Sequence, residues 1–258
     1  MQTVIKIIVC LIAGVGAGFG TGFAGMSAAA VISPMLITFL DMDPYLAVGI
    51  ALSSDVLASA VSAVTYGKNK NLDTRNGLFM MAAVLLFTFV GSYVADLVPK
   101  TTMGNFSTVM TLLLGIKFIV RPVMEPKARL TNATVAQKVV RSVLCGSVVG
   151  FICGFVGAGG GMMMLLLLTS VLGYELKTAV GTSVFIMAFT ALTGAVSHFA
   201  IGGAPDLPAL AVCVASTLLW ALIASRLANR AQPKTLNRVV GIILVVLGAS
   251  ILAVNYLF

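Results

Sequence analysis

The chain has 258 residues, of which 59% are hydrophobic and only 9% are charged. Soluble domains carry about 25% charged residues, so this composition excludes an ordinary soluble enzyme or binding domain. A net charge of +8 would suit a nucleic-acid partner in a soluble protein. No nucleic-acid-binding motif is visible, however, and a bias of basic loops toward the cytoplasm explains the charge better. We therefore expect an integral membrane protein whose partner is the lipid bilayer and not nucleic acid.

The apolar residues are concentrated in about ten segments, separated by loops with turn and charge signals. They fall at about 4–24, 27–40, 45–66, 77–97 and 104–120, and then at about 139–157, 160–173, 178–200, 207–227 and 237–257. Lipid admits only helices or closed barrels, and most of these runs are too long for barrel strands. The predicted fold class is therefore an all-α integral membrane protein with no separate soluble domain. The first segment lacks a convincing cleavage site and is interpreted as a retained helix.

The two groups of five segments are predicted to be repeats. A single register pairs Gly18, Gly22, Gly25 and Gly49 of the first half with Gly150, Gly154, Gly157 and Gly181 of the second. Such internal repeats are typical of secondary transporters. We assign residues 1–122 to the first repeat, 123–138 to a cytoplasmic linker and 139–258 to the second repeat.

The distribution of Lys and Arg predicts the orientation. If all five segments of each half cross the membrane, every basic residue except Lys6 and Lys100 falls on one side. That side is expected to be cytoplasmic, with both termini outside, in the inner (plasma) membrane of a bacterial-type cell. An odd number of crossings per half inverts the second repeat. Segments 27–40 and 160–173 are too short to span about 30 Å, so whether they cross fully or form re-entrant half-helices stays open.

A glycine-rich break precedes the short helix of each half. Inverted repeats bring two helix N-termini toward the bilayer midplane, where their free N–H groups bind anions. We therefore expect a small anionic substrate held between the breaks. The alternative is that the glycines only allow two helices to pack closely. The residues assigned to this site are Gly22, Gly25, Met26 and Ser27 in the first break, and Gly157, Ala158, Gly159, Gly160 and Gly161 in the second. Ser27 could instead cap its own helix.

Hydroxyl side chains near the start of the following long helices are further candidates for the same cavity. They are Ser53, Ser54, Thr182 and Ser183. The alternative for each is a hydrogen bond to the backbone carbonyl one turn back, which is common in membrane helices.

Two titratable residues are candidates for proton coupling. Asp55 lies in the middle of an apolar helix, where an acid is costly and is by default a functional hypothesis. Its alternative is a protonated carboxyl that makes one interhelical hydrogen bond. His198, the only histidine, could titrate near neutral pH or simply lie at the membrane interface. The four cysteines lie in apolar segments with no metal-binding spacing, so we expect no disulfide, no metal site and no cofactor.

These features resemble the TauE/SafE family of membrane exporters. The resemblance rests on the repeated Gly-x-x-x-Gly-Phe-x-Gly pattern, Gly157-Ala-Gly159-Gly160-Gly161, Ala179-Val-Gly181-Thr182-Ser183, and His198 with Asp206. It covers essentially the whole chain and implies transport of sulfite or organosulfonates, usually outward. The first half departs from the pattern. Gly25-Met-Ser27-Ala-Ala replaces the run of glycines, Gly49-Ile-Ala replaces Gly-Thr-Ser, Tyr66 replaces histidine, and Asp55 is not part of the pattern.

The leading interpretation is a proton-coupled secondary transporter that works by alternating access, and not an enzyme. A passive anion channel would share the site without the coupling. An intramembrane hydrolase would need Ser27 or Ser183 within hydrogen-bond reach of His198. The sequence leaves open whether the chain forms a homodimer.

Overall fold

The computed structural model describes residues 2–95, 134–156 and 160–257, together with isolated positions between 112 and 120. Within these ranges every regular element is an α-helix, as the composition predicts. The first group of helices is α1 (Gln2–Ala24), α2 (Ala29–Leu40), α3 (Pro44–Lys68) and α4 (Thr74–Ala95). The second group is α6 (Val135–Val156), α7 (Gly160–Ser170), α8 (Leu176–Gly202), α9 (Leu207–Arg230) and α10 (Pro233–Leu257). The predicted segment 104–120 lies almost entirely outside the described residues.

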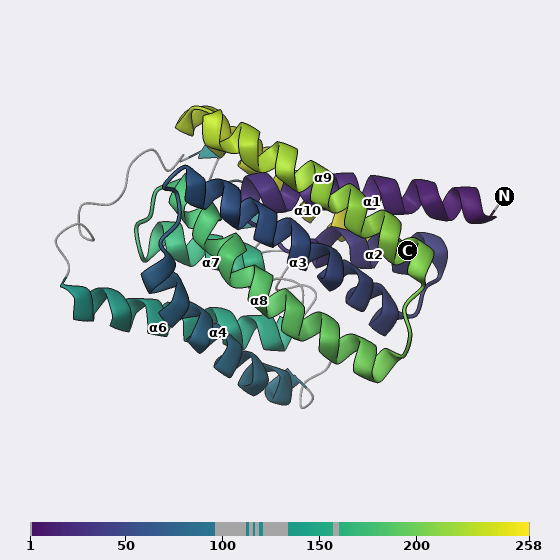
Figure 1. Ribbon diagram of the computed structural model, residues 1–258, viewed down its shortest axis with the longest axis horizontal. Helices are drawn as coiled ribbons and strands as arrows, with labels where there is room; N and C mark the ends of the chain where they lie inside the picture. Colours follow the sequence, from purple (N-terminus) through teal and green to yellow (C-terminus); the bar gives the residue numbers. More distant parts are fainter. Residues whose placement is uncertain are drawn as a thin grey trace.

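The long helices pack side by side in pairs (Figure 1). Helices α3 and α8 run through the middle of the molecule in contact with each other. Helix α1 packs against α9 on one side of this central pair, and α4 packs against α6 on the other. The short helices α2 and α7 connect the outer pairs to the centre, because α2 contacts α1 and α3 while α7 contacts α6 and α8.

Four of the described helices are long and apolar enough to cross a membrane. These candidate spans are Thr3–Ala24, Leu46–Lys68, Leu176–Val196 and Leu207–Arg230. Ala29–Leu40, Thr74–Val90 and Val139–Phe151 are apolar but shorter. A multi-pass membrane protein follows from the four spans, while the count of ten segments stays a prediction.

Glycines bring the paired helices into close contact. A Cβ added at Gly14, Gly18 or Gly22 of α1 would lie 2.5, 2.7 or 2.6 Å from an atom of α9. In α6, a Cβ added at Gly146 or Gly150 would lie 2.5 or 2.4 Å from a backbone carbonyl oxygen of α4. Small residues spaced four apart let helix backbones approach in this way inside a membrane. Gly14, Gly18 and Gly22 therefore have a packing role in α1, and Gly22 is a residue that we had assigned to the substrate site.

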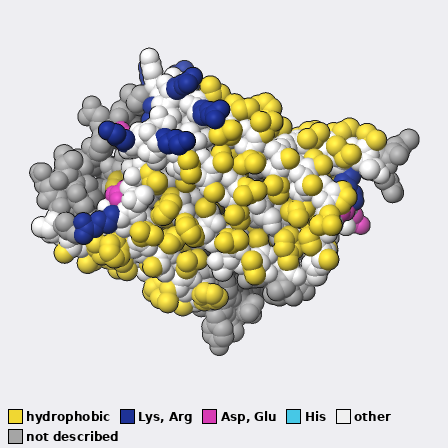
Figure 2. Space-filling model, in the orientation of Figure 1, with side chains coloured by type: hydrophobic (Ala, Val, Ile, Leu, Met, Phe, Trp, Pro, Cys, Tyr) yellow, Lys and Arg dark blue, Asp and Glu magenta, His cyan; other side chains and the backbone are white. Residues whose placement is uncertain are grey.

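Charge and hydrophobicity are separated along the molecule. Figure 2 shows Lys and Arg side chains gathered at one end and hydrophobic side chains covering the middle. Exposed basic residues come from the helix ends and loops that meet there, among them Lys68, Lys70, Arg75, Arg226, Arg230 and Lys234. At the opposite end Lys6 forms an ion pair with Asp206. This arrangement is the one expected of a molecule whose apolar middle lies in lipid.

Candidate functional site

The first glycine-rich break is a short turn between α1 and α2. The N–H of Gly25 donates to the carbonyl oxygen of Thr21 at 3.0 Å, and the N–H of Met26 donates to that of Gly20 at 3.3 Å. Gly25 has a φ of +61°, a left-handed conformation that glycine adopts without a steric penalty. The chain therefore leaves α1 at Gly25 and turns back into α2.

Asp55 of α3 lies at the beginning of α2. The hydroxyl of Ser27 donates to its Oδ2 at 2.7 Å and the hydroxyl of Ser59 donates to its Oδ1 at 2.8 Å. The Asp55 side chain is completely buried. The position where the sequence predicted an external anion is therefore filled, in the first half, by a carboxylate of the protein itself.

Ser27 takes part in two interactions at this turn. Besides donating to Asp55, its Oγ accepts a hydrogen bond from the N–H of Ala29 at 3.3 Å. The hydroxyl therefore satisfies one of the free N–H groups in the first turn of α2, as a capping residue does. It also positions the carboxylate against the same helix end.

The second break lies against the first one. Gly157, Ala158 and Gly159 are outside the described residues, and α7 begins at Gly160. A Cβ added at Gly161 would lie 2.9 Å from the backbone nitrogen of Ser27. Only glycine permits this approach, so the first turn of α7 is in direct contact with the turn that leads into α2.

Helix α8 completes the contact between the breaks. The hydroxyl of Ser183 donates to the carbonyl oxygen of Gly25 at 2.9 Å and is fully buried. The added Cβ at Gly161 would also lie 3.2 Å from this oxygen. Of the residues assigned to the site from sequence, Gly25, Ser27, Asp55, Gly161 and Ser183 are thus brought together.

The remaining hydroxyls of the predicted site have partners elsewhere. Ser53 and Ser54 donate to the carbonyl oxygens of Gly49 and Ile50, each at 2.9 Å and each one turn back in α3. This is the structural alternative that the sequence left open. Thr182 accepts a hydrogen bond from the N–H of Asp73 at 3.2 Å and so joins α8 to the loop before α4.

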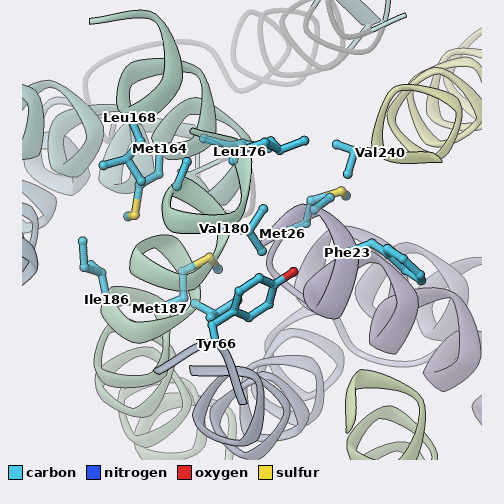
Figure 3. Packing of buried hydrophobic residues seen from close by; sticks show 14 of the residues in the cluster. Phe23, Met26, Tyr66, Met164, Leu168, Leu176, Val180, Ile186, Met187 and Val240 are labelled. Carbon is cyan, nitrogen blue, oxygen red and sulfur yellow. The ribbon is translucent and has the colours of Figure 1, made fainter. Parts of the chain in front are cut away.

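Met26 packs in the hydrophobic core beside the break. Its side chain is 1% exposed and belongs to the same buried cluster as Phe23, Tyr66 and Val180 (Figure 3). The hydroxyl of Tyr66 donates to the carbonyl oxygen of Gly22 at 2.8 Å. Tyr66 and Ser59 were not assigned to the site from sequence. The sequence could have identified both residues, because they lie at helical spacing from Asp55 on one face of α3.

Three buried hydroxyls of the first three helices are unsatisfied. Among the described residues, Thr21 of α1, Ser33 of α2 and Ser62 of α3 have no hydrogen-bond partner for their side-chain oxygens. An unpaired hydroxyl in an apolar interior is unfavourable, and such groups mark functional sites or sites of internal water. The interior between the first three helices is therefore more polar than lipid packing requires.

The last two residues of the predicted motif, His198 and Asp206, lie at the end of the molecule opposite the clustered Lys and Arg side chains. His198 is in the last turns of α8, and its side chain is outside what the structure describes. Asp206 caps α9 by accepting from the N–H of Ala209 at 3.1 Å. The hydrogen bond from Lys6 holds the pKa of the Asp206 carboxyl below its ordinary value. Asp206 therefore joins the beginnings of α1 and α9, away from the meeting breaks.

Comparison with known proteins agrees with this membrane architecture. A family model described as "Sulfite exporter TauE/SafE" matches residues 10–251. The chain is 27% identical over 268 residues to the "probable membrane transporter protein YunE" of Bacillus subtilis, and 98% of each chain is covered. It is 25% identical over 252 residues to the "probable membrane transporter protein MJ0441" of Methanocaldococcus jannaschii, covering 91% of this chain and 88% of that one. "Probable membrane transporter protein YjnA" of Bacillus subtilis is 23% identical over 255 residues, with 94% and 98% covered.

Proposed function

The chain belongs to the sulfite exporter TauE/SafE family, and from this premise we propose that it exports a small sulfur oxyanion such as sulfite or an organosulfonate. One observation carries the proposal. The turn before α2 and the first turn of α7 are in direct contact, as the approach of Gly161 to Ser27 shows. Two helix N-termini at one point offer backbone N–H groups to an anion.

A sulfur oxyanion suits such a site. Its oxygens can accept several N–H and O–H bonds at once, and hydrogen bonds to charged acceptors are stronger than those to neutral ones. The hydroxyls of Ser27 and Ser183 lie at the same turn. Binding of this kind needs no metal. Among the described residues, no group of three His, Cys, Asp or Glu side chains could hold one.

The helix contacts support our proposal of two inverted repeats. Under the register that pairs Gly18 with Gly150, α1 corresponds to α6 and α4 to α9. The contact of α1 with α9 therefore corresponds to the contact of α6 with α4. Helices α3 and α8 are each other's counterparts, so exchanging the two repeats leaves their contact unchanged. Repeats that exchange roles around a central site are the usual basis of alternating access in secondary transporters.

The charge distribution supports the proposed orientation. The end that gathers exposed Lys and Arg side chains would face the cytoplasm (Figure 2). The end that holds the ion pair between Lys6 and Asp206 would then face outward. Both termini would lie outside, in the plasma membrane of a bacterial-type cell.

Proton coupling through Asp55 is part of the proposal, with His198 as the second candidate carrier. An acid buried this completely inside a membrane helix is rarely retained for stability alone. A hydrolase is disfavoured because the hydroxyls of Ser27 and Ser183 donate to Asp55 and to Gly25. Neither is therefore prepared for transfer of its proton to a histidine.

Transport in proteoliposomes tests the function. Vesicles that contain the purified protein are given radiolabelled methanesulfonate, an organosulfonate whose charge does not change with pH, with and without an imposed pH gradient; sulfite flux is followed without accumulation as the readout. We expect methanesulfonate to accumulate above the external concentration when the gradient is present, and not to accumulate in protein-free vesicles. A passive channel would equilibrate methanesulfonate but never accumulate it. Sulfite flux that is insensitive to the pH gradient and to Asp55→Asn would exclude proton coupling through Asp55, and the absence of flux for sulfite and organosulfonates would exclude the proposed substrates.

A further inference from the structure

A carboxylate engages a hydrogen-bond donor at the start of α2. The hydroxyl of Ser27, just before α2, and the hydroxyl of Ser59, in α3, converge on Asp55. A carboxylate and a sulfur oxyanion both bind through negatively charged oxygens that accept several hydrogen bonds. Asp55 therefore occupies hydroxyl donors at the start of α2 that a transported anion could also use.

The second half lacks such a carboxylate. The register that pairs Gly18 with Gly150 places Asp55 opposite Met187 and Ala29 opposite Gly161. A Cβ added at Gly161 would lie 2.7 Å from the sulfur of Met187, so Met187 lies at the start of α7, as Asp55 lies at the start of α2. The residue on the central helix that faces the start of the short helix is thus an acid in the first half and an apolar thioether in the second.

No charged side chain neutralises Asp55 among the described residues. Helix α2 has no titratable residue. The other helices packed against α3 contribute these titratable or charged side chains: Lys6 and Cys10 from α1, Lys177 and His198 from α8, and Cys213, Arg226 and Arg230 from α9. Lys6 pairs with Asp206, Lys177 donates to the carbonyl oxygen of Asn229, and the two arginines are exposed. Among the side chains that the structure describes, Asp55 is therefore held by hydrogen-bond donors and not by a cation.

Starting from the proposed anion transport, we propose that Asp55 is a tethered anion that competes with the transported sulfur oxyanion for the donors at the start of α2. With Asp55 ionised, the donors are engaged, and a second negative charge at the same helix end would be repelled. When a proton binds to a carboxylate oxygen of Asp55, the side chain becomes neutral and binds the Ser27 hydroxyl less strongly. The transported oxyanion then accepts the hydrogen bond from this hydroxyl.

This competition makes proton and anion travel together. The loaded state carries one proton and one anion more than the empty state, so movement of a monovalent anion is electroneutral. Export would then be driven by the substrate gradient and opposed by an acid exterior, because each anion takes a proton out with it, and it would not depend on the membrane potential. The second half, where Met187 replaces the acid, would bind the anion without this condition.

Equilibrium binding to the full-length protein in lipid nanodiscs tests the inference. The probe is methanesulfonate, because its charge does not change between mildly acid and mildly alkaline pH, whereas sulfite itself titrates near neutrality. For the wild type we expect Kd to rise by about tenfold per pH unit above the pH at which Asp55 ionises. Asp55→Asn should bind with a Kd that is flat with pH and close to the acid limit of the wild type. Asp73→Asn, an acid in the loop before α4, is the matched control and should keep the wild-type pH dependence.

A second measurement needs no variant. Calorimetric titration of the wild type in two buffers of different ionisation enthalpy gives the number of protons taken up per anion bound. We expect this number to approach one above the pH at which Asp55 ionises. Binding with no proton uptake, or a pH dependence that persists in Asp55→Asn, would overturn the inference while leaving the anion transporter in place. If neither methanesulfonate nor sulfite binds at any pH, both the proposed function and the inference are wrong.

Discussion

The hydroxyl of Tyr66 donates to the carbonyl oxygen of Gly22 at 2.8 Å, and this bond joins α3 to the last turn of α1. The last carbonyls of a helix have no intrahelical N–H to accept from. The N–H of Met26, which would serve Gly22 in a continuous helix, donates to Gly20 instead. Tyr66 therefore satisfies a carbonyl that the glycine-rich break leaves free.

Replacing Tyr66 with phenylalanine is expected to destabilise the protein. The Tyr66 side chain is fully buried, so Tyr66→Phe leaves the Gly22 carbonyl unpaired in an apolar environment. Such a loss costs about 1–3 kcal/mol. Thermal unfolding in detergent should show a lower midpoint for Tyr66→Phe. Ser250→Ala, which removes an exposed hydroxyl that bonds within α10, should leave the midpoint unchanged. Equal midpoints for Tyr66→Phe and wild type would show that the bond adds nothing.

The contact between the two breaks can be tested with one methyl group. In Gly161→Ala the new Cβ would lie 2.9 Å from the backbone nitrogen of Ser27, so the turn and α7 must separate. Overpacking of this kind costs about 1–3 kcal/mol, and we expect transport to fall with stability. The matched control is Gly20→Ala, whose Cβ would lie 3.7 Å from the flexible end of Met26. It should transport like the wild type, and transport by Gly161→Ala at the wild-type rate would contradict the close approach.

The ion pair between Lys6 and Asp206 predicts a pH-dependent contribution to stability. The pKa of Asp206 is lowered in the folded protein, first by the hydrogen bond from Lys6. The unfolded chain therefore binds the proton more readily. The stabilisation is present above the ordinary carboxyl pKa and is lost as pH falls through the lowered value. Asp206→Asn should be less stable than the wild type at neutral pH, and the difference should disappear in strong acid.

A second variant at this position separates the ion pair from the helix cap. Asparagine caps a helix as well as aspartate does, whereas alanine does not. Asp206→Ala should therefore lose about 1 kcal/mol more than Asp206→Asn, at acid pH as well as at neutral pH. If the two variants unfold together, the bond from Ala209 does not contribute to stability.

The proposed orientation predicts which end of α9 is accessible from outside the cell. Ala204 and Gln232 are both exposed and lie just beyond the two ends of this helix. In a background that lacks the four native cysteines, a membrane-impermeant maleimide should label Ala204→Cys in intact cells. It should label Gln232→Cys only after the membrane is opened. The reverse pattern would invert the topology.

The sequence alone determined the membrane class, the helical fold and the short helices that follow the glycine-rich breaks. The segment predicted at 27–40 is α2 (Ala29–Leu40), and the one predicted at 160–173 is α7 (Gly160–Ser170). These features are local, because hydropathy and glycine content act within a segment and lipid leaves its backbone no other regular structure. Asp55 was identified for a similar reason, since an acid in an apolar helix is conspicuous without knowledge of its neighbours.

Only the tertiary structure decided what each polar side chain contacts. The sequence treated Ser27, Ser53 and Thr182 as candidates for the same cavity. In the structure the Ser27 hydroxyl donates to Asp55 and the Ser53 hydroxyl donates to the carbonyl oxygen of Gly49 in the same helix. The Thr182 hydroxyl accepts from the N–H of Asp73. Likewise, nothing in the local pattern indicated that Asp55 would lie on the end of α2. Partners of this kind depend on which faces of distant helices meet, and that is set by close packing of small residues between helices and not by the composition of any one helix.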